Sequence, residues 1–313
     1  MSGLNKKRFA LIFGPCIIFV LLVILIFVNK SPVSPPAVDS LAESDLPTIK
    51  QNIFEFALSA ESFISVYVSK NGEDKILIEK EKNRQLPIAS ITKLMTALIA
   101  SEEYTAKDIV TVSRESLLVK GVSGLYQVGD KLFFSDALFA MLVASHNELA
   151  SALAEKIGVE KFVDLMNKKT LSLGLSNTRF VNSVGTDSDI NSGPINHSTA
   201  DDLYRLARYI RVNKPDILSI TTTKELDLFD SNKKFIEKIK NTNKLLTQKD
   251  FLFNIIGGKT GETPRAKKNL VLVIDAPCAG TIYSVVLGSE DNFDDMEKLL
   301  KYTSSSYSWN CKI

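Results

Sequence analysis

Ser90 and Lys93 stand three residues apart in the largely apolar stretch PIASITKLMTALIA, which covers 87–100. Residues i and i+3 of a helix share one face, so these two side chains can meet. A serine hydroxyl attacks a carbonyl when a neighbouring base takes its proton, and an uncharged lysine can be that base. A simpler interpretation makes Ser90 the N-cap of an ordinary helix and Lys93 a solvated neighbour. The position of Lys93 argues against it, because a cation in the first turn faces the positive end of the helix dipole.

Lys259 is a candidate for a second cation near Lys93. It follows an apolar run in the segment IIGGKTGETP and is expected at the end of a strand. A nearby cation, or burial, lowers the pKa of a lysine and would leave Lys93 uncharged. Ser145 and Asn147, in the segment VASHNELA, are expected in the gap between two helices. Together these residues predict nucleophilic catalysis by a serine with a lysine base.

Other common chemistries find little support in the sequence. The chain has two histidines, His146 and His197, and three cysteines, with no H-E-x-x-H segment, so neither a metal nor a cofactor is predicted. A Ser-His-Asp triad would need one of these histidines, and we interpret His146 as a bystander. The segment GGKTG is not a Walker motif, because Phe253 stands where its first glycine is required. The net charge is +2, which gives no sign of nucleic-acid binding.

Strand-like patterns lie at both ends of the chain and helical patterns lie between them. The early strands form a hairpin around Asn71 and Gly72, which favour a tight turn. We expect strands in 62–80, 269–276 and 281–289, and helices in 90–100, 135–145, 147–158, 159–174, 198–212 and 291–303. The two ends can complete one antiparallel sheet of about five strands with a helical lobe inserted beside it, which is an α+β fold. The cleft between sheet and lobe is the natural place for a site.

The three polar groups, taken in order, resemble a known set of motifs. SITK at 90–93, SHN at 145–147 and KTG at 259–261 are similar to the three motifs of the penicillin-recognising serine hydrolases. S-x-x-K occurs twice in the chain and S-x-N three times, so the ordered set, and no single motif, carries the resemblance. The chain is most similar to the D-alanyl-D-alanine carboxypeptidases, the low-molecular-mass penicillin-binding proteins, over roughly residues 60 to 290. The resemblance implies a β-lactamase/transpeptidase-like fold.

The resemblance also implies how the substrate would be acylated. Ser90 would attack the peptide carbonyl of a peptidoglycan stem peptide ending in D-Ala-D-Ala, and Lys93 would accept its proton. Ser145 and Asn147 would complete the proton relay and hold the substrate. β-Lactam antibiotics would act as covalent inhibitors at the same serine. The implied activity is removal of the terminal D-alanine through an acyl-serine intermediate.

A second set of residues is implied for substrate binding. Lys259 would supply positive potential, and Thr260 would bind the terminal carboxylate of the substrate. Gly261 would let the substrate backbone lie along the strand as an added strand. The oxyanion hole would consist of the backbone N–H groups of Ser90 and Glu262, and a helix N-terminus at Ser90 suits that task.

Three alternatives to a carboxypeptidase stay open. Many family members have an arginine after the last strand that holds the substrate carboxylate, whereas this chain has the acidic segment SEDNFDDMEK at 289–298. That difference makes a D,D-endopeptidase acting on peptide cross-links plausible. A β-lactamase shares the motifs, but no E-x-x-L-N segment for deacylation lies between Ser145 and Lys259. The third alternative is a cell-wall-binding module that turns nothing over.

The N-terminus is expected to attach the protein to a membrane. Three basic residues at 6–8 precede an uncharged run at 9–28, which is long enough to span a bilayer as a helix. We expect 1–8 to be a cytoplasmic segment and 9–28 an uncleaved single-pass anchor in the bacterial cell membrane, with cleavage near Ala37 as the alternative. The Pro-rich stretch 29–47 reads as a linker, and 48–313 as the extracytoplasmic peptidase domain.

The cysteines give weaker information. Cys16 lies inside the expected membrane span. Cys278 and Cys311 would face an oxidising space and could pair, but two cysteines could equally be small buried residues.

Overall fold

The computed structural model describes residues 46–50, 57–187, 192–309 and 311. All of them belong to one compact unit, Asp45–Ile313. The expected cytoplasmic segment, the expected membrane anchor and nearly all of the expected linker lie outside the described residues. Among the helices that are described, none is both long enough and apolar enough to cross a membrane.

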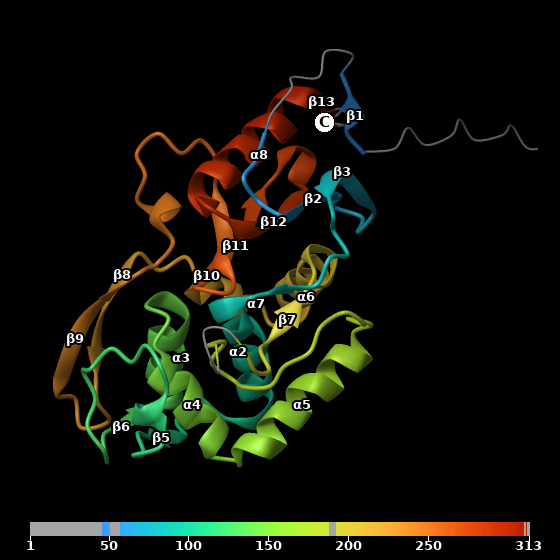
Figure 1. The fold of residues 1–313 in the computed structure, drawn as a ribbon. Coiled ribbons are helices and arrows are strands. Elements are labelled where there is room, and N and C mark those ends of the chain that lie inside the picture. Colours follow the sequence, from blue (N-terminus) through green and yellow to red (C-terminus); the bar gives the residue numbers. More distant parts are fainter. Residues whose placement is uncertain (1–45, 51–56, 188–191, 310, 312–313) are drawn as a thin grey trace, which may run out of the picture. The chain divides into compact units, whose positions relative to one another are not determined.

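A five-stranded antiparallel sheet joins the two ends of this unit (Figure 1). The strand order is β10-β11-β12-β2-β3, and the strands are β2 (Ser62–Val68), β3 (Asp74–Lys80), β10 (Ile255–Thr263), β11 (Lys267–Asp275) and β12 (Thr281–Ser289). Early and late parts of the chain meet where β12 pairs with β2, and Ser284 lies opposite Ser65. The hairpin at the start, the antiparallel pair at the end and their union in one sheet are therefore confirmed.

Each face of the sheet covers its own hydrophobic cluster, because side chains alternate along a strand. In β11, Val271 and Val273 point into the larger cluster, beneath the helical lobe. Leu270, Leu272 and Ile274 point into the smaller cluster on the other face. The alternation explains why the strand is apolar without interruption from Leu270 to Ile274: this part is buried on both sides.

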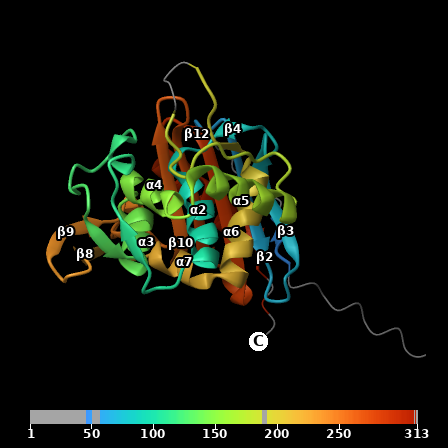
Figure 2. The same ribbon diagram turned by 90° about the horizontal axis from the view of Figure 1, so that it is seen from below.

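Helices cover both faces (Figures 1 and 2). α8 (Asn292–Ser306), which Asp291 caps, packs on β11 and β12. The helical lobe contains α2 (Thr92–Glu103), α3 (Phe134–Val143), α4 (Asn147–Glu155), α5 (Val159–Ser172), α6 (Ala200–Asn213) and α7 (Pro215–Ile220). Figure 2 shows α2 among the other helices of the lobe, and it contacts α3, α4, α5, α6 and α7. The expected α+β fold with a helical lobe is confirmed.

The expected helix at 90–100 begins differently from the prediction. A short 3₁₀ turn, η1 (Ala89–Ile91), precedes α2, and Ser90 lies within that turn. Ser90 therefore makes no N-cap hydrogen bond to α2, and the simpler interpretation of this residue is wrong. Residues of α2 from Thr92 to Ala100 are all buried, so Lys93 lies in the interior and not among solvated surface charges.

Several short elements were not expected from the sequence. They include the hairpin of β8 (Glu225–Phe229) and β9 (Phe235–Lys240), and the small pairs β1 (Thr48–Ile49) with β13 (Tyr307–Ser308), β4 (Leu86–Pro87) with β7 (His197–Ser198), and β5 (Ile109–Thr111) with β6 (Lys131–Phe133). Further 3₁₀ turns are η2 (Ser116–Leu118), η3 (Lys244–Leu246) and η4 (Pro277–Ala279). Most of these pairs are too short for a periodic pattern to be seen.

Cys278 and Cys311 form a disulfide bond across 33 residues of sequence. Cys278 lies in η4, at the turn between β11 and β12, and Cys311 follows β13. The bond holds the chain after α8 against the end of the sheet. Of the two possibilities that the sequence left open, pairing is the one observed.

Asp295 joins α8 to the sheet through buried hydrogen bonds. Its carboxylate accepts from the Ser59 backbone N–H at 3.0 Å, from Ser59 Oγ at 2.7 Å and from Ser289 Oγ at 2.5 Å. Asp295 is 2% exposed. The carboxylate therefore ties together the chain just before β2, the end of β12 and the first turn of α8.

We predict that Asp295→Ala lowers the free energy of unfolding by about 2–3 kcal/mol, because it leaves buried donors without a charged acceptor. The matched control is Asp294→Ala on the same helix, which removes only an exposed ion pair to Lys298 and should cost about 1 kcal/mol or less. Urea unfolding followed by circular dichroism measures both values. Equal losses in the two variants would contradict the role given to Asp295.

Candidate active site

Lys93 and Ser90 are brought together at the start of α2, as the sequence predicts. Lys93 Nζ lies 2.8 Å from Ser90 Oγ. The same nitrogen lies 2.7 Å from Asn147 Oδ1 and 2.8 Å from the carbonyl oxygen of Val184. These two oxygens can only accept hydrogen bonds. An uncharged amine has two N–H groups and one lone pair, so the two acceptors leave the lone pair for the Ser90 hydroxyl.

The surroundings of Lys93 favour its uncharged form. Its side chain is fully buried, and burial is the main cause that holds its pKa well below the usual value. The positive charge of Lys259 lowers the pKa further, while the negative charge of Glu148 acts in the opposite direction. Burial also lowers the pKa of Lys259, to about 7. The geometry and the electrostatics therefore agree on Lys93 as the base.

Ser145 and Lys259 form a second polar contact beside the first. Ser145 lies between α3 and α4, as expected, and has a left-handed backbone with φ of 65°. Lys259 Nζ lies 3.1 Å from Ser145 Oγ and 3.2 Å from the carbonyl oxygen of Thr260. Lys259 stands in the middle of β10, so the expectation of a strand end is wrong. Its mid-strand position places it beneath the surface, where it is 1% exposed.

Asn147, the first residue of α4, links these groups to a neighbouring segment. Its Oδ1 faces Lys93, and its Nδ2 donates to the carbonyl oxygens of Lys120 and Gly121 at 2.8 and 3.0 Å. His146 points elsewhere: its Nδ1 lies 2.9 Å from the Tyr126 hydroxyl. Its Nε2 lies 3.3 Å from Glu237 Oε1, so both ring nitrogens face groups other than Ser90 and Lys93, in keeping with the interpretation of His146 as a bystander to the chemistry.

Gly261 lets β10 approach the turn that carries Ser90. A Cβ atom on Gly261 would come within 2.7 Å of the carbonyl oxygen of Ile88 and 3.1 Å of the backbone nitrogen of Ser90. Any larger residue would push the strand away from η1. Ser90 and Glu262, whose backbone N–H groups the resemblance implies as an oxyanion hole, line the same cavity.

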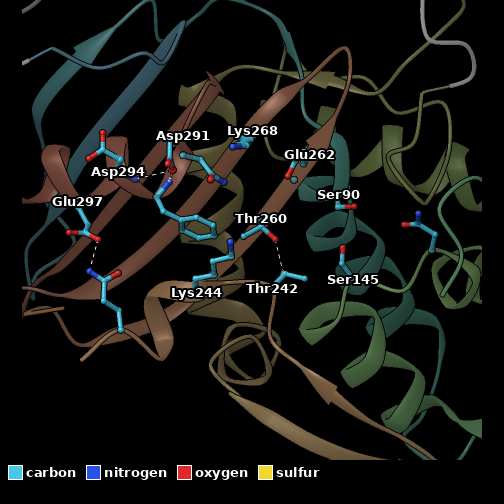
Figure 3. A pocket seen from close by; sticks show the side chains of 15 residues that line it. Ser90, Ser145, Thr242, Lys244, Thr260, Glu262, Lys268, Asp291, Asp294 and Glu297 are labelled. Carbon is cyan, nitrogen blue, oxygen red and sulfur yellow. Dashed lines mark hydrogen bonds between the residues drawn. The ribbon is translucent and has the colours of Figure 1, made fainter. Parts of the chain in front are cut away.

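A cavity of about 670 Å³ opens between η1, α4 and β10 (Figure 3). Ser90, Ser145, Asn147, Thr260, Gly261 and Glu262 all line it, whereas Lys93 and Lys259 lie buried behind its wall. Thr260 reaches toward the opening, where its Oγ1 lies 2.7 Å from Thr242 Oγ1. All the site residues expected from the sequence thus converge on one place.

The sequence did not identify the far end of this cavity. Its wall there consists of Thr242, Lys244, Gln248, Lys268, Asp291, Asn292, Phe293, Asp294 and Glu297. Figure 3 shows Lys244 extending toward Thr260 from η3. Two signals were available: the segment KNTNKLL at 240–246 precedes the KTG strand, and the segment at 289–298 lacks an arginine. Neither indicates that both segments line one cavity, because they meet only through the fold.

The residues described in the structure contain no group of three or more histidine, cysteine, aspartate or glutamate side chains placed to hold a metal ion.

Comparison with known proteins identifies the family. A model of D-alanyl-D-alanine carboxypeptidases matches residues 49–291. The chain belongs to this family. It is 31% identical to a D-alanyl-D-alanine endopeptidase of Pseudomonas aeruginosa, over 76% of each protein. It is also 31% identical to the D-alanyl-D-alanine carboxypeptidase DacC of Escherichia coli, over 73% of this chain and 58% of that one.

Solved structures of family members have the same fold. The penicillin-binding protein D2 of Listeria monocytogenes in its ampicillin-bound form is 28% identical, with a TM-score of 0.68 over 80% of this chain and 99% of that one. A D-alanyl-D-alanine carboxypeptidase of Mycobacterium tuberculosis is 23% identical, with a TM-score of 0.71 over 82% and 95%. The penicillin-binding, transpeptidase-like fold that the resemblance implies is thus confirmed.

We predict that Lys93→Ala loses acylation by a fluorescent penicillin, because Ser90 then has no base. The expected loss is on the order of 10³-fold in the rate constant, the size typical of a general base. Labelling of the purified protein followed by gel fluorescence measures it, and circular dichroism checks that the variant is folded. A folded variant that labels at the wild-type rate would show that another group takes the proton.

Proposed function

We propose that the protein is a membrane-anchored serine D,D-peptidase that removes the terminal D-alanine from peptidoglycan stem peptides. The observation that carries the proposal is the contact of Lys93 with Ser90, in which a buried amine lies 2.8 Å from the hydroxyl oxygen and its two other neighbours are acceptors only. This arrangement can activate a serine without a histidine or a metal. Membership of the family indicates the class of substrate, and the contact between Ser90 and Lys93 indicates the type of reaction.

The reaction would proceed in two stages. Ser90 Oγ attacks the carbonyl carbon of the penultimate D-alanine while Lys93 Nζ takes the hydroxyl proton. The negative charge on the carbonyl oxygen is held by the backbone N–H groups of Ser90 and Glu262. The C–N bond then breaks, and the leaving D-alanine takes a proton that Lys93 and Ser145 can relay. Water attacks the acyl-serine in the second stage and restores the free hydroxyl.

The terminal carboxylate of the substrate would bind at the far end of the cavity. Thr260 and Thr242 offer hydroxyl groups there. Lys244 and Lys268 line the same cavity, and neither forms an ion pair with any residue that the structure describes. We infer that Lys244 supplies the positive charge that an arginine supplies in other family members. With a lysine in this role, the enzyme could bind the terminal carboxylate and act as a carboxypeptidase without that arginine.

A specific observation also favours the endopeptidase alternative. Asp291, Asp294 and Glu297 line the cavity beside the lysines, at the N-cap and in the first two turns of α8. These carboxylates would attract the amino groups of a cross-linked stem peptide. They would repel the free terminal carboxylate of a stem peptide that is not cross-linked. Three of the matched relatives are named D-alanyl-D-alanine endopeptidases, and each is 31% identical to this chain. Endopeptidase activity is therefore our second candidate.

The other two alternatives differ in how long an acyl group stays on Ser90. A β-lactamase must hydrolyse its acyl-enzyme rapidly. Glu237 and Asn241 do have E-x-x-x-N spacing, but Lys240 stands at the leucine position, and Asn241 Nδ2 is held by the carbonyl oxygens of Thr221 and Thr223. We therefore propose lasting penicillin label on Ser90, absent in Ser90→Ala. Rapid loss of label would indicate a β-lactamase, and no label a binding module.

We predict that the purified protein in detergent releases one alanine from monomeric muropeptides that end in D-Ala-D-Ala. Mass spectrometry of the products detects it. Lys244→Met should slow this release about tenfold, the effect of losing one charged hydrogen bond. The matched control is Lys249→Met, an exposed lysine nearby that does not line the cavity.

The outcomes of this experiment separate the candidates. Splitting of cross-linked dimers without release of terminal alanine would make the protein an endopeptidase. Equal rates for the Lys244 and Lys249 variants would contradict the carboxylate-binding role of Lys244.

We also propose that residues 9–28 form a membrane helix with 1–8 in the cytoplasm and 29–47 as a tether. The support is the basic cluster followed by twenty uncharged residues, both read from the sequence. The disulfide between Cys278 and Cys311 suits an extracytoplasmic position of the peptidase domain.

Removing residues 1–30 is predicted to release the protein from the membrane with its penicillin labelling intact. The reason is that these residues contain the whole uncharged run, while the site is built from residues 88 onward. Fractionation of expressing cells followed by fluorescent penicillin labelling measures both properties. A truncated protein that stays with the membrane would indicate a second attachment.

A further inference from the structure

Glu148 is a buried charged residue next to the site that the mechanism above does not use. It is the second residue of α4, directly after Asn147, and it is 0% exposed. Its Oε1 accepts hydrogen bonds from the Ser123 backbone N–H at 2.9 Å and from Ser123 Oγ. Within the described part of the chain, Oε2 accepts no hydrogen bond. Burying a carboxylate is costly, so its presence here requires a reason.

Three consecutive side chains at the start of α4 hold the same neighbouring segment, 120–126. His146 contacts the Tyr126 hydroxyl, Asn147 donates to the carbonyl oxygens at 120 and 121, and Glu148 accepts from Ser123. The segment lies between η2 and β6 and contains no helix or strand. The position of the segment therefore depends strongly on the hydrogen bonds that these three side chains make with it.

The segment in turn decides which end of the Asn147 amide faces Lys93. The two carbonyl oxygens occupy both hydrogens of Asn147 Nδ2, at 2.8 and 3.0 Å. A flipped amide would place its oxygen against these carbonyls and its N–H groups against the amine of Lys93. The Oδ1 atom of Asn147 must therefore face Lys93. There it accepts a hydrogen bond from one N–H of the amine, which helps to orient the lone pair of Lys93 Nζ toward Ser90.

We propose that Glu148 is a positioning residue for the acylation of Ser90. By binding Ser123 it holds the segment 120–126 in place, and the segment fixes the Asn147 amide against Lys93. The inference rests on the proposed function, because it concerns how the base of that reaction is oriented. Glu148 itself touches neither the substrate nor Ser90.

The charge of Glu148 has a second effect, which a purely structural contact would lack. It raises the pKa of Lys93, against the lowering by burial and by Lys259. His146 and Glu237 also face this region: burial lowers the pKa of His146 while the charge of Glu148 raises it, and burial together with Glu148 raises the pKa of Glu237. Lys93 must be uncharged to act, so the acylation rate rises with pH through its pKa. Removing the charge of Glu148 should move this rise to lower pH.

The test is the rate constant for acylation by a fluorescent penicillin, measured by stopped flow as a function of pH. Glu148→Ala should lower it roughly 100-fold, the loss typical of a misplaced catalytic group. Glu148→Gln keeps an oxygen for Ser123 and should restore most of the rate, with the rise shifted to lower pH. The matched control is Glu155→Ala on the same helix, whose carboxylate binds Ser113 and Ser151 away from the cavity, and it should keep the wild-type profile.

A wild-type rate and pH profile in Glu148→Ala would overturn the proposal. So would a Glu148→Gln variant that loses as much rate as Glu148→Ala. Should Glu148→Ala not fold, Glu148→Gln and Ser123→Ala decide the matter, and Ser123→Ala is expected to lose about tenfold because it retains only the backbone hydrogen bond. Acylation of the wild-type protein is measured in the same series, so failure of this inference is distinct from failure of the proposed function.

Discussion

Burial of a single amine is the constraint on which the rest of this structure depends. An ammonium group is stable in water and unstable in a protein interior, so a lysine kept inside loses its proton unless a carboxylate pairs with it. Lys93 is surrounded by a hydroxyl, an amide oxygen and a carbonyl oxygen, all of them uncharged. Much of the fold can be understood as the means of keeping it there.

The helical lobe supplies that interior. α2 is surrounded by the other helices of the lobe, and its first turn is as deeply buried as its middle. The sheet supplies the opposite wall, because Gly261 allows β10 to come against η1 without a side chain between them. Lys259 then reaches Ser145 from the strand side. The cavity lies where the helical lobe and the sheet diverge. A substrate in it would contact the hydroxyl groups of Ser90 and Ser145, while the amines of Lys93 and Lys259 lie buried behind those hydroxyl groups.

The sequence predicted the parts of this arrangement that repeat or follow a pattern. Short apolar runs bounded by turn residues located the sheet strands, and the three ordered motifs located Ser90, Ser145 and Lys259. It placed Lys259 at the end of a strand because the apolar run stops there, whereas the strand continues through polar residues that face the cavity. It failed to find Lys244, because this lysine acquires its position only when η3 folds beside β10 and α8. It also passed over Glu148, since a glutamate early in a helix is ordinary and only its burial reveals a special role.

The most direct test of the account is the protonation state of Lys93 itself. Lysine labelled with ¹³C and ¹⁵N gives NMR signals whose shifts report the charge of each side-chain amine, and Lys93→Ala assigns the signal. The account predicts that Lys93 is uncharged at neutral pH, with a pKa well below that of the surface lysines, and that its pKa rises when Lys259 is replaced by methionine. A Lys93 signal that titrates together with the surface lysines, unchanged by the Lys259 substitution, would contradict it.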